Sequence, residues 1–249
     1  MSSLTITPLP GLPEIASGAD LAVLIAAAAR RARLTAEAGD IFVVAQKIVS
    51  KAEGRVVQLG AVTPSAKARA WAEEWGKDAR VVELVLAESA TILRMERGII
   101  IAETRHGYIC ANAGVDVSNA ADATAILLPL NPDASARTLQ AALSRAFGVP
   151  VAVIVSDTFG RAWREGLVNI ALGVAGMAPL QDLRGRKDAN GRELAATIIA
   201  TADEVAAAAE LVMGKDKNIP VAILSGLALG GVPGSGKDLL RAKSLDLFR

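Results

Sequence analysis

The chain has 249 residues, of which 52% are hydrophobic and 21% charged, a composition typical of a globular protein and too apolar for a disordered one. Lysine and arginine number 27 against 26 aspartates and glutamates, so the overall charge gives no electrostatic sign of nucleic-acid or anionic-membrane binding. The single cysteine and single histidine exclude an internal disulfide and metal sites built from several cysteines or histidines, so any metal must be held by oxygen.

The start of the chain, MSSLTITPLP, lacks a basic region followed by an apolar core. No apolar run reaches about 18 residues without a charge. We therefore expect no export signal, no membrane segment and a cytoplasmic location.

Apolar or β-branched runs bounded by turn residues predict strands along the whole chain. They cover 4–9, 41–46, 98–104, 108–114, 149–157 and 219–226. The last four runs are mostly continuous, which is typical of strands buried on both faces.

Helical patterns lie between these strands. An Ala-rich helix is predicted over 21–33 with Asp20 as its N-cap, and further helices over 65–76, 133–147 and 191–213. No repeat or linker interrupts the pattern. We expect a mixed α/β (α+β) fold with mixed sheets and packed helices, forming one domain over 1–249 whose division into two closely packed lobes is left open.

Polar residues collect where the predicted strands end. The strand at 41–46 is followed by Gln46, Lys47, Ser50, Lys51 and Arg55. Two interpretations stay open for this segment: a loop that holds a ligand, as loops after buried strands of α/β proteins do, or a solvated basic turn.

Two aspartates follow other apolar strands. Asp116 comes after the strand at 108–114, close to Asn112, Ser118 and Asn119, and Asp157 with Thr158 follows the most hydrophobic strand of the chain. An isolated aspartate in such a place is ordinarily a turn or cap residue. A pair of them, one followed by a hydroxyl, suits Mg²⁺ or Mn²⁺ completed by water and phosphate.

A group of basic residues comes next in the sequence and suits anions. It consists of Arg161, Arg164, Arg184, Arg186 and Lys187. Carboxylates for a metal together with guanidinium groups for phosphate are typical of phosphoryl transfer, so the residues alone predict a metal-dependent enzyme that acts on phosphate-bearing substrates.

The stretch GGVPGSGKD, from Gly230 to Asp238, comes within one residue of a phosphate-binding P-loop. The residue after Lys237 is an aspartate, where a P-loop needs a hydroxyl for Mg²⁺, and the chain ends too soon for the supporting helix and strands. We expect a flexible Gly-rich turn and no P-loop fold.

Six segments in this order resemble one family over almost the whole chain. They are GLPEI, VVAQKIVSKAEGR, ANAGVDVSN, SDTFGRAWREG, LRGRKDANGREL and MGKDKNIP. Together they resemble the coenzyme F420-0:gamma-glutamyl ligases. The resemblance implies a GTP-dependent enzyme that adds L-glutamate to the deazaflavin coenzyme F420-0, with Mg²⁺ or Mn²⁺, a stimulating K⁺, a homodimer, and a nucleotide held away from the Gly-rich stretch.

The resemblance also implies site residues. The metal ligands of the family fall on Asp116, Asp157 and Thr158, and the two aspartates are the residues expected to be catalytic. The nucleotide contacts fall on Leu12, Pro13, Glu14, Ile15, Gln46, Lys47, Lys51, Asn119, Met213, Gly214, Lys215, Asp216, Lys217, Asn218 and Ile219.

The sequence departs from the family pattern at one position. The family can supply a further acidic metal ligand just after the Met-Gly pair, where this chain has Lys215. Either Asp216 takes that role or the second metal is held by fewer protein groups. The resemblance gives no firm role to the five basic residues named above.

An amide bond requires activation of a carboxylate, so we expect GTP to form an acyl phosphate that the amine of glutamate attacks. Two alternatives remain: a metal-dependent phosphoester hydrolase that uses the same aspartates, and a GTP-binding module without turnover. His106 and Cys110 are expected to be structural. The sequence gives neither the number of glutamates added nor the preferred metal.

Overall fold

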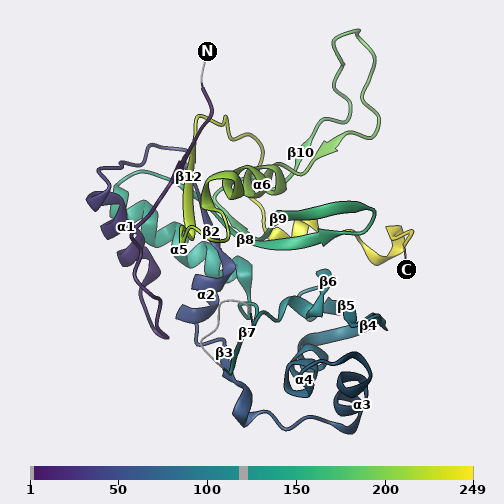
Figure 1. The fold of residues 1–249 in the computed structure, drawn as a ribbon. Helices are drawn as coiled ribbons and strands as arrows, with labels where there is room; N and C mark the ends of the chain where they lie inside the picture. The colour runs from purple at the N-terminus through teal and green to yellow at the C-terminus, as the bar shows by residue number, and fades with distance from the viewer. Residues whose placement is uncertain (1–2, 118–122, 249) are drawn as a thin grey trace.

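A computed structural model describes residues 3–117 and 123–248. Its centre is a five-stranded sheet with the order β1-β12-β2-β8-β9 (Figure 1). These strands are β1 (Thr5–Pro8), β12 (Val221–Ser225), β2 (Ile41–Ala45), β8 (Ala152–Arg161) and β9 (Arg164–Ala175). Only β2 and β8 are parallel, and the other neighbours run antiparallel. The predicted mixed α/β fold is confirmed.

Helices cover both faces of this sheet because alternate strand residues point to opposite sides. Val153 and Val155 face α1 (Leu21–Arg31), α2 (Gln46–Ala52) and α5 (Pro132–Phe147), whereas Ala152 and Ile154 face α6 (Thr201–Met213). All four strand residues are fully buried. The continuous apolar character of 149–157 therefore has the predicted cause, burial on both faces.

Two helices begin after a capping side chain, and a third begins later in the chain than predicted. Asp20 caps α1 as predicted, accepting a hydrogen bond from the N–H of Val23 at 3.1 Å, and Asn131 caps α5. The predicted helix at 191–213 is wrong over its first ten residues, because α6 begins only at Thr201. Residues 191–199 instead pair back on 181–187, through β10 (Gln181–Asp182) and β11 (Ile198–Ile199).

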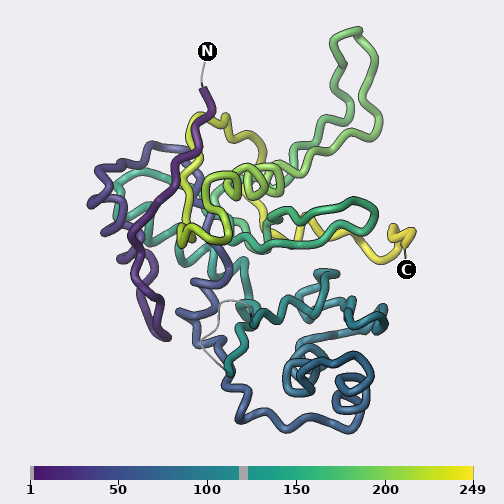
Figure 2. Tube along the Cα trace, viewed as in Figure 1, coloured from purple at the N-terminus to yellow at the C-terminus, as the bar shows by residue number. Residues whose placement is uncertain are grey.

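A second lobe lies below the sheet in Figure 1. It contains α3 (Ala66–Trp75), α4 (Ala79–Glu88) and the sheet β4 (Ser89–Glu96), β5 (Ile99–Thr104), β6 (Ile109–Ala111) around its own apolar core. Sequence patterns did not predict α4 or β4. Figure 2 shows the chain entering this lobe after β3 (Val56–Gln58) and returning at β7 (Thr124–Ile126), which pairs with β3.

The two lobes contact each other through a small apolar cluster. Tyr108 and Cys110 pack against Phe159 and Leu172 of the β8–β9 hairpin, and the Tyr108 hydroxyl donates to the carbonyl of Leu172. The strand β6 is buried only on this side, since Ile109 is 39% exposed. The prediction that 108–114 is buried on both faces is therefore wrong.

Short 3₁₀ turns complete the fold: η1 (Leu59–Ala61), η2 (Asn112–Gly114), η3 (Gly236–Leu239) and η4 (Lys243–Leu245). Within the described ranges, none of the helices combines the length and apolar character that crossing a bilayer requires.

Candidate active site

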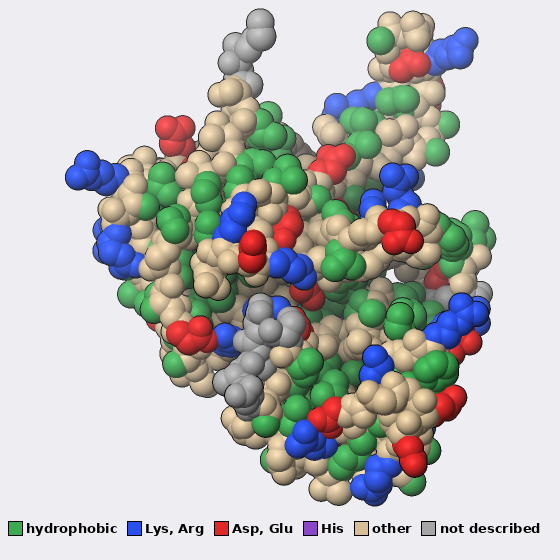
Figure 3. All heavy atoms as spheres, in the orientation of Figure 1, with side chains coloured by type: hydrophobic (Ala, Val, Ile, Leu, Met, Phe, Trp, Pro, Cys, Tyr) green, Lys and Arg blue, Asp and Glu red, His purple; other side chains and the backbone are tan. Residues whose placement is uncertain are grey.

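A cavity of about 1180 Å³ lies where the end of β2, the middle of β8, the start of α2 and the end of α6 meet. The N-terminal segment 12–15 forms part of its wall. Figure 3 shows acidic and basic side chains gathered around the middle of the molecule, between the two lobes. The volume is sufficient for a ligand of nucleotide size.

The cavity exists because two parallel strands have different lengths. β2 ends at Ala45, opposite Ser156, and the chain turns directly into α2, whereas β8 continues to Arg161. From Asp157 onward β8 has lost its β2 neighbour, so side chains there border open space. Two expectations are corrected: Asp157 and Thr158 lie within a strand, not at its end, and the segment after 41–46 is a helix, not a loop.

Most of the residues carried over from the family line this cavity. They are Leu12, Pro13, Glu14, Ile15, Gln46, Lys47, Lys51, Asp157, Thr158, Met213, Gly214, Lys215, Asn218 and Ile219. The turn after α6 depends on Gly214, whose φ of 61° is one that other residues rarely adopt.

Three of the predicted residues that the structure describes do not line the cavity. Asp116 does not line the cavity but pairs with Lys47, which does; Lys47 Nζ lies 2.5 Å from Asp116 Oδ2. Asp216 and Lys217 are exposed and lie outside the lining. Asn119 lies outside the described residues.

The electrostatics centre on Asp157. Loss of water around its carboxylate raises its pKa from the ordinary 3.8 to about 6. The negative charge of Asp116 adds to this rise, while the N–H of Thr158 and the ammonium groups of Lys215 and Lys47 oppose it. The charges of the two carboxylates thus repel each other, and a cation bound to both would relieve that repulsion.

The donor atoms fit a hard cation. Asp116 and Asp157 offer carboxylate oxygens, and the buried hydroxyl of Ser156 in the cavity wall has no hydrogen-bond partner. Among the residues that the structure describes, no three His, Cys, Asp or Glu side chains gather into a metal-binding group. Oxygen donors of this kind suit Mg²⁺ or Mn²⁺, and such an ion would need waters or phosphate oxygens as its remaining ligands.

Comparison with known proteins identifies the family. The model of the F420-0:Gamma-glutamyl ligase family matches residues 11–226. The chain belongs to this family. It is 45% identical to the coenzyme F420:L-glutamate ligase of Methanothermobacter thermautotrophicus over 249 residues, covering 99% of both chains. It is 44% identical to the ligase of the same name from Methanopyrus kandleri, covering 100% of this chain and 99% of that one.

Membership of the F420-0:gamma-glutamyl ligase family places the chain among the ligases of coenzyme F420 biosynthesis. Further polar residues line its cavity that sequence reasoning missed. They are Ser17, Gln58, Thr124, Ser156, Asn169 and Glu210. Ser156 is the first residue of the segment SDTFGRAWREG, and Glu210 lies three residues before MGKDKNIP, so both had a sequence signal. The position of Asn169 opposite Thr158 depends on the β8–β9 register.

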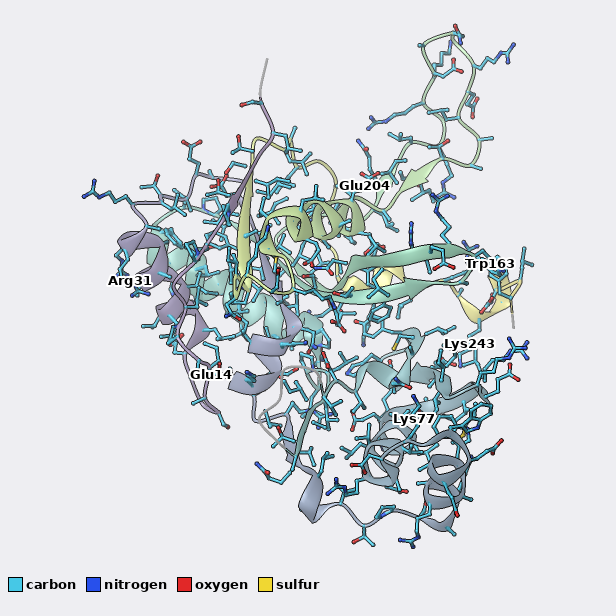
Figure 4. All side chains as sticks on the ribbon, viewed as in Figure 1. Glu14, Arg31, Lys77, Trp163, Glu204 and Lys243 are labelled. Atoms are coloured by element: carbon cyan, nitrogen blue, oxygen red, sulfur yellow. The ribbon has the colours of Figure 1, made fainter. Side chains whose placement is uncertain are left out.

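The five basic residues do not reach the cavity. Arg161 and Arg164 lie at the turn of the β8–β9 hairpin, where Figure 4 labels Trp163. Residues 184–187 belong to the ribbon that projects beside β10 in Figure 1, and Arg184 Nη2 pairs with Asp182 at 2.5 Å. None of the five lines the cavity, so the structure does not bring these cations to the aspartates.

The Gly-rich stretch does not line the cavity either. Its last residues make hydrogen bonds: the N–H of Gly236 donates to Asp133 Oδ1 at 2.6 Å, and Ser235 with Asp238 forms a capping box. The exclusion of a P-loop agrees with the fold, because the 3₁₀ turn η3 begins at Gly236, where a P-loop would lead into an α-helix.

Cys110 and His106 lie outside the cavity lining. Burial, with a smaller contribution from Asp157, raises the pKa of the Cys110 thiol to about 12, which leaves no thiolate for nucleophilic chemistry. His106 Nε2 lies 2.9 Å from the carbonyl oxygen of Pro129. These environments agree with structural roles.

Proposed function

We propose that this protein is a GTP-dependent ligase that adds L-glutamate to coenzyme F420-0 through an acyl-phosphate intermediate. The observation that carries the proposal is the desolvated carboxylate of Asp157 in a cavity edged by Lys47, Lys51 and Lys215. A cation site beside ammonium groups suits the phosphates of a nucleotide. The family relation supplies the acceptor and the amino acid.

The reaction transfers the γ-phosphoryl group of GTP to an oxygen of the terminal carboxylate of the acceptor, which forms an acyl phosphate and releases GDP. The amine of L-glutamate then attacks the carbonyl carbon, loses a proton, and the carbon–oxygen bond to phosphate breaks, which leaves an amide and inorganic phosphate. A bound Mg²⁺ or Mn²⁺ would offset the charge on the β- and γ-phosphates.

The side chains of this protein have positioning and electrostatic roles in that scheme. Asp116 and Asp157, with Thr158, would hold the cation, and the lysines would orient the phosphates. No protein nucleophile is required. By the same family relation we propose stimulation by K⁺, a homodimer and a cytoplasmic location; light scattering during size-exclusion chromatography measures the oligomeric state.

The test incubates the purified protein with GTP, Mg²⁺ or Mn²⁺, L-glutamate and F420-0, followed by mass spectrometry for glutamyl additions. Phosphate release must depend on glutamate, and GTP must support the reaction far better than ATP. GTP consumption without glutamate would favour the phosphoester hydrolase, GTP binding without turnover would favour the inactive module, and equal rates with ATP would contradict the proposed nucleotide.

Replacing Lys51 by Ala is expected to weaken GTP binding by about 1–3 kcal/mol, the range for losing a hydrogen bond to a charged group. The Lys51 side chain lines the cavity and is 18% exposed, and its Nζ lies 2.5 Å from Glu14 Oε1. Calorimetric titration with GTP measures the effect. Lys67→Ala is the control, because this lysine is exposed on α3 and lies outside the cavity lining; an equal loss in both variants would contradict a phosphate contact by Lys51.

Lys237→Ala is expected to leave GTP affinity within a few-fold of the parent. Lys237 is exposed on η3, outside the cavity lining, and an exposed charge is screened over roughly 8–10 Å. The same titration measures it. A loss of about 100-fold, comparable to removing a P-loop lysine, would place the phosphates at the Gly-rich stretch instead.

A further inference from the structure

Three side chains from three elements form a hydrogen-bond network in the cavity wall. The hydroxyl of Thr158 on β8 donates to Asn169 Oδ1 at 2.6 Å, and Asn169 Nδ2 donates to Glu210 Oε2 at 3.0 Å. Asn169 lies on β9 directly opposite Thr158, and Glu210 belongs to the last turn of α6, which packs on these strands (Figure 1). All three residues line the cavity.

The carboxylate of Glu210 fixes the direction of every bond in this network. A carboxylate only accepts hydrogen bonds, so the amide NH₂ of Asn169 must face Glu210 and its carbonyl oxygen must face Thr158. The single hydroxyl proton of Thr158 is then committed to Asn169. Toward the cavity the Thr158 oxygen presents only lone pairs.

A hydroxyl oxygen in this state attracts a cation and cannot donate to an anion. Without Asn169 the Thr158 hydroxyl could rotate and turn its proton, instead of its lone pairs, toward the cavity. A proton directed into the cavity would oppose cation binding there. The network therefore has a direct consequence for cation binding.

We propose that Asn169 and Glu210 are positioning residues that keep the lone pairs of the Thr158 hydroxyl directed at the metal ion. The inference rests on the proposed function, in which Thr158 is a metal ligand. Asn169 orients the hydroxyl and Glu210 orients Asn169, so Glu210 acts through its acceptor oxygen, not through its charge. Residues behind a metal ligand commonly change metal affinity by about 10–100-fold.

The experiment is a calorimetric titration of the full-length protein with Mn²⁺, in the presence of a non-hydrolysable GTP analogue. Asn169→Ala and Glu210→Ala are expected to weaken Mn²⁺ binding about 10-fold or more. Glu210→Gln is expected to stay within about 3-fold of the parent, because a glutamine oxygen still accepts from Asn169. Thr158→Val is measured alone and in combination with Asn169→Ala, as a double-mutant cycle. In the Thr158→Val background, Asn169→Ala is expected to weaken Mn²⁺ binding little further.

Gln140→Ala is the matched control for the loss of a hydrogen-bonded amide. Gln140 Nε2 donates to the carbonyl of Val151 at 3.0 Å, away from the cavity lining. This variant is expected to unfold at a lower temperature with unchanged Mn²⁺ affinity. If Asn169→Ala does not fold, the comparison of Glu210→Gln with Glu210→Ala decides the question.

Equal damage by Glu210→Gln and Glu210→Ala would overturn the proposal, because the charge of Glu210 would then act directly. Parent-like affinity in Asn169→Ala, or an absence of Mn²⁺ binding by the parent, would also overturn it. A parent that binds Mn²⁺ with the expected variant pattern but forms no glutamyl product would refute only the proposed function. If the parent forms the glutamyl product and Asn169→Ala binds Mn²⁺ with normal affinity, only the proposed role of Asn169 and Glu210 is refuted.

Discussion

Asp157→Asn is expected to reduce ligation at least about 100-fold and, at the same time, to stabilise the metal-free protein at pH 8. The first effect follows because a neutral amide replaces one of two carboxylates that face the proposed cation. The second follows from the raised pKa of about 6, compared with the ordinary 3.8. Removing a charge that the folded state disfavours adds stability.

The sign of the pH dependence follows from the direction of that shift. A carboxyl whose folded-state pKa is raised stabilises the fold fully below about 3.8 and loses this contribution as the pH rises through about 6. At pH 8 the ionised carboxylate of Asp157 destabilises the folded parent, and a neutral asparagine does not. The free energy of unfolding of the variant should therefore be higher by about 1–3 kcal/mol. The gain should shrink toward pH 4. Urea unfolding in EDTA at several pH values measures it.

Asp182→Asn is the matched control, since it removes the same charge from an exposed position. Hydrogen bonds from Arg184 lower the pKa of Asp182 to about 2, so the sign is opposite and this variant should gain no stability at pH 8. It should also ligate normally. A metal-free Asp157→Asn protein that is less stable than the parent at pH 8 would contradict the raised pKa of Asp157. A variant that ligates at a near-parental rate would show that the cation lies elsewhere.

Asp133→Ala is expected to destabilise the protein by about 2–5 kcal/mol. Asp133 is buried at the start of α5, and its Oδ1 accepts from the N–H groups of Val174 at 3.0 Å and Gly236 at 2.6 Å. The alanine variant leaves two buried donors without a partner, each at a cost of about 1–3 kcal/mol. Guanidinium unfolding measures the loss, and proteolysis should become faster near Lys237, because the anchor of that segment is gone.

Two variants separate this cause from a general effect of removing an acid. Asp133→Asn keeps an acceptor oxygen and should lose less stability than Asp133→Ala. Glu204→Ala removes an acid from the first turn of α6, at an exposed position labelled in Figure 4, and should cost less than about 1 kcal/mol. An Asp133→Ala protein within about 1 kcal/mol of the parent would contradict the buried anchor.

Local sequence patterns predicted several elements because the physics behind them is local. The cap by Asp20 and the helical spacing that follows it depend on neighbouring residues, and α1 begins where they indicate. The apolar run at 149–157 became β8, covered on both faces. Local patterns failed at 191–200, where pairing with the ribbon at 181–187 prevailed over helix propensity.

The sequence also identified Asp116 and Asp157 as a pair that suits a hard cation, and the family resemblance added the segments that line the cavity. Only the tertiary structure decided how these residues meet. Lys47 reaches Asp116 because β2 ends early and turns into α2, and Asn169 reaches Thr158 because of the β8–β9 register. Register, strand length and contacts between lobes are set by pairings between segments far apart in the chain, and no local pattern encodes them. For the same reason, the sequence could not show that the basic residues after Asp157 lie away from the cavity.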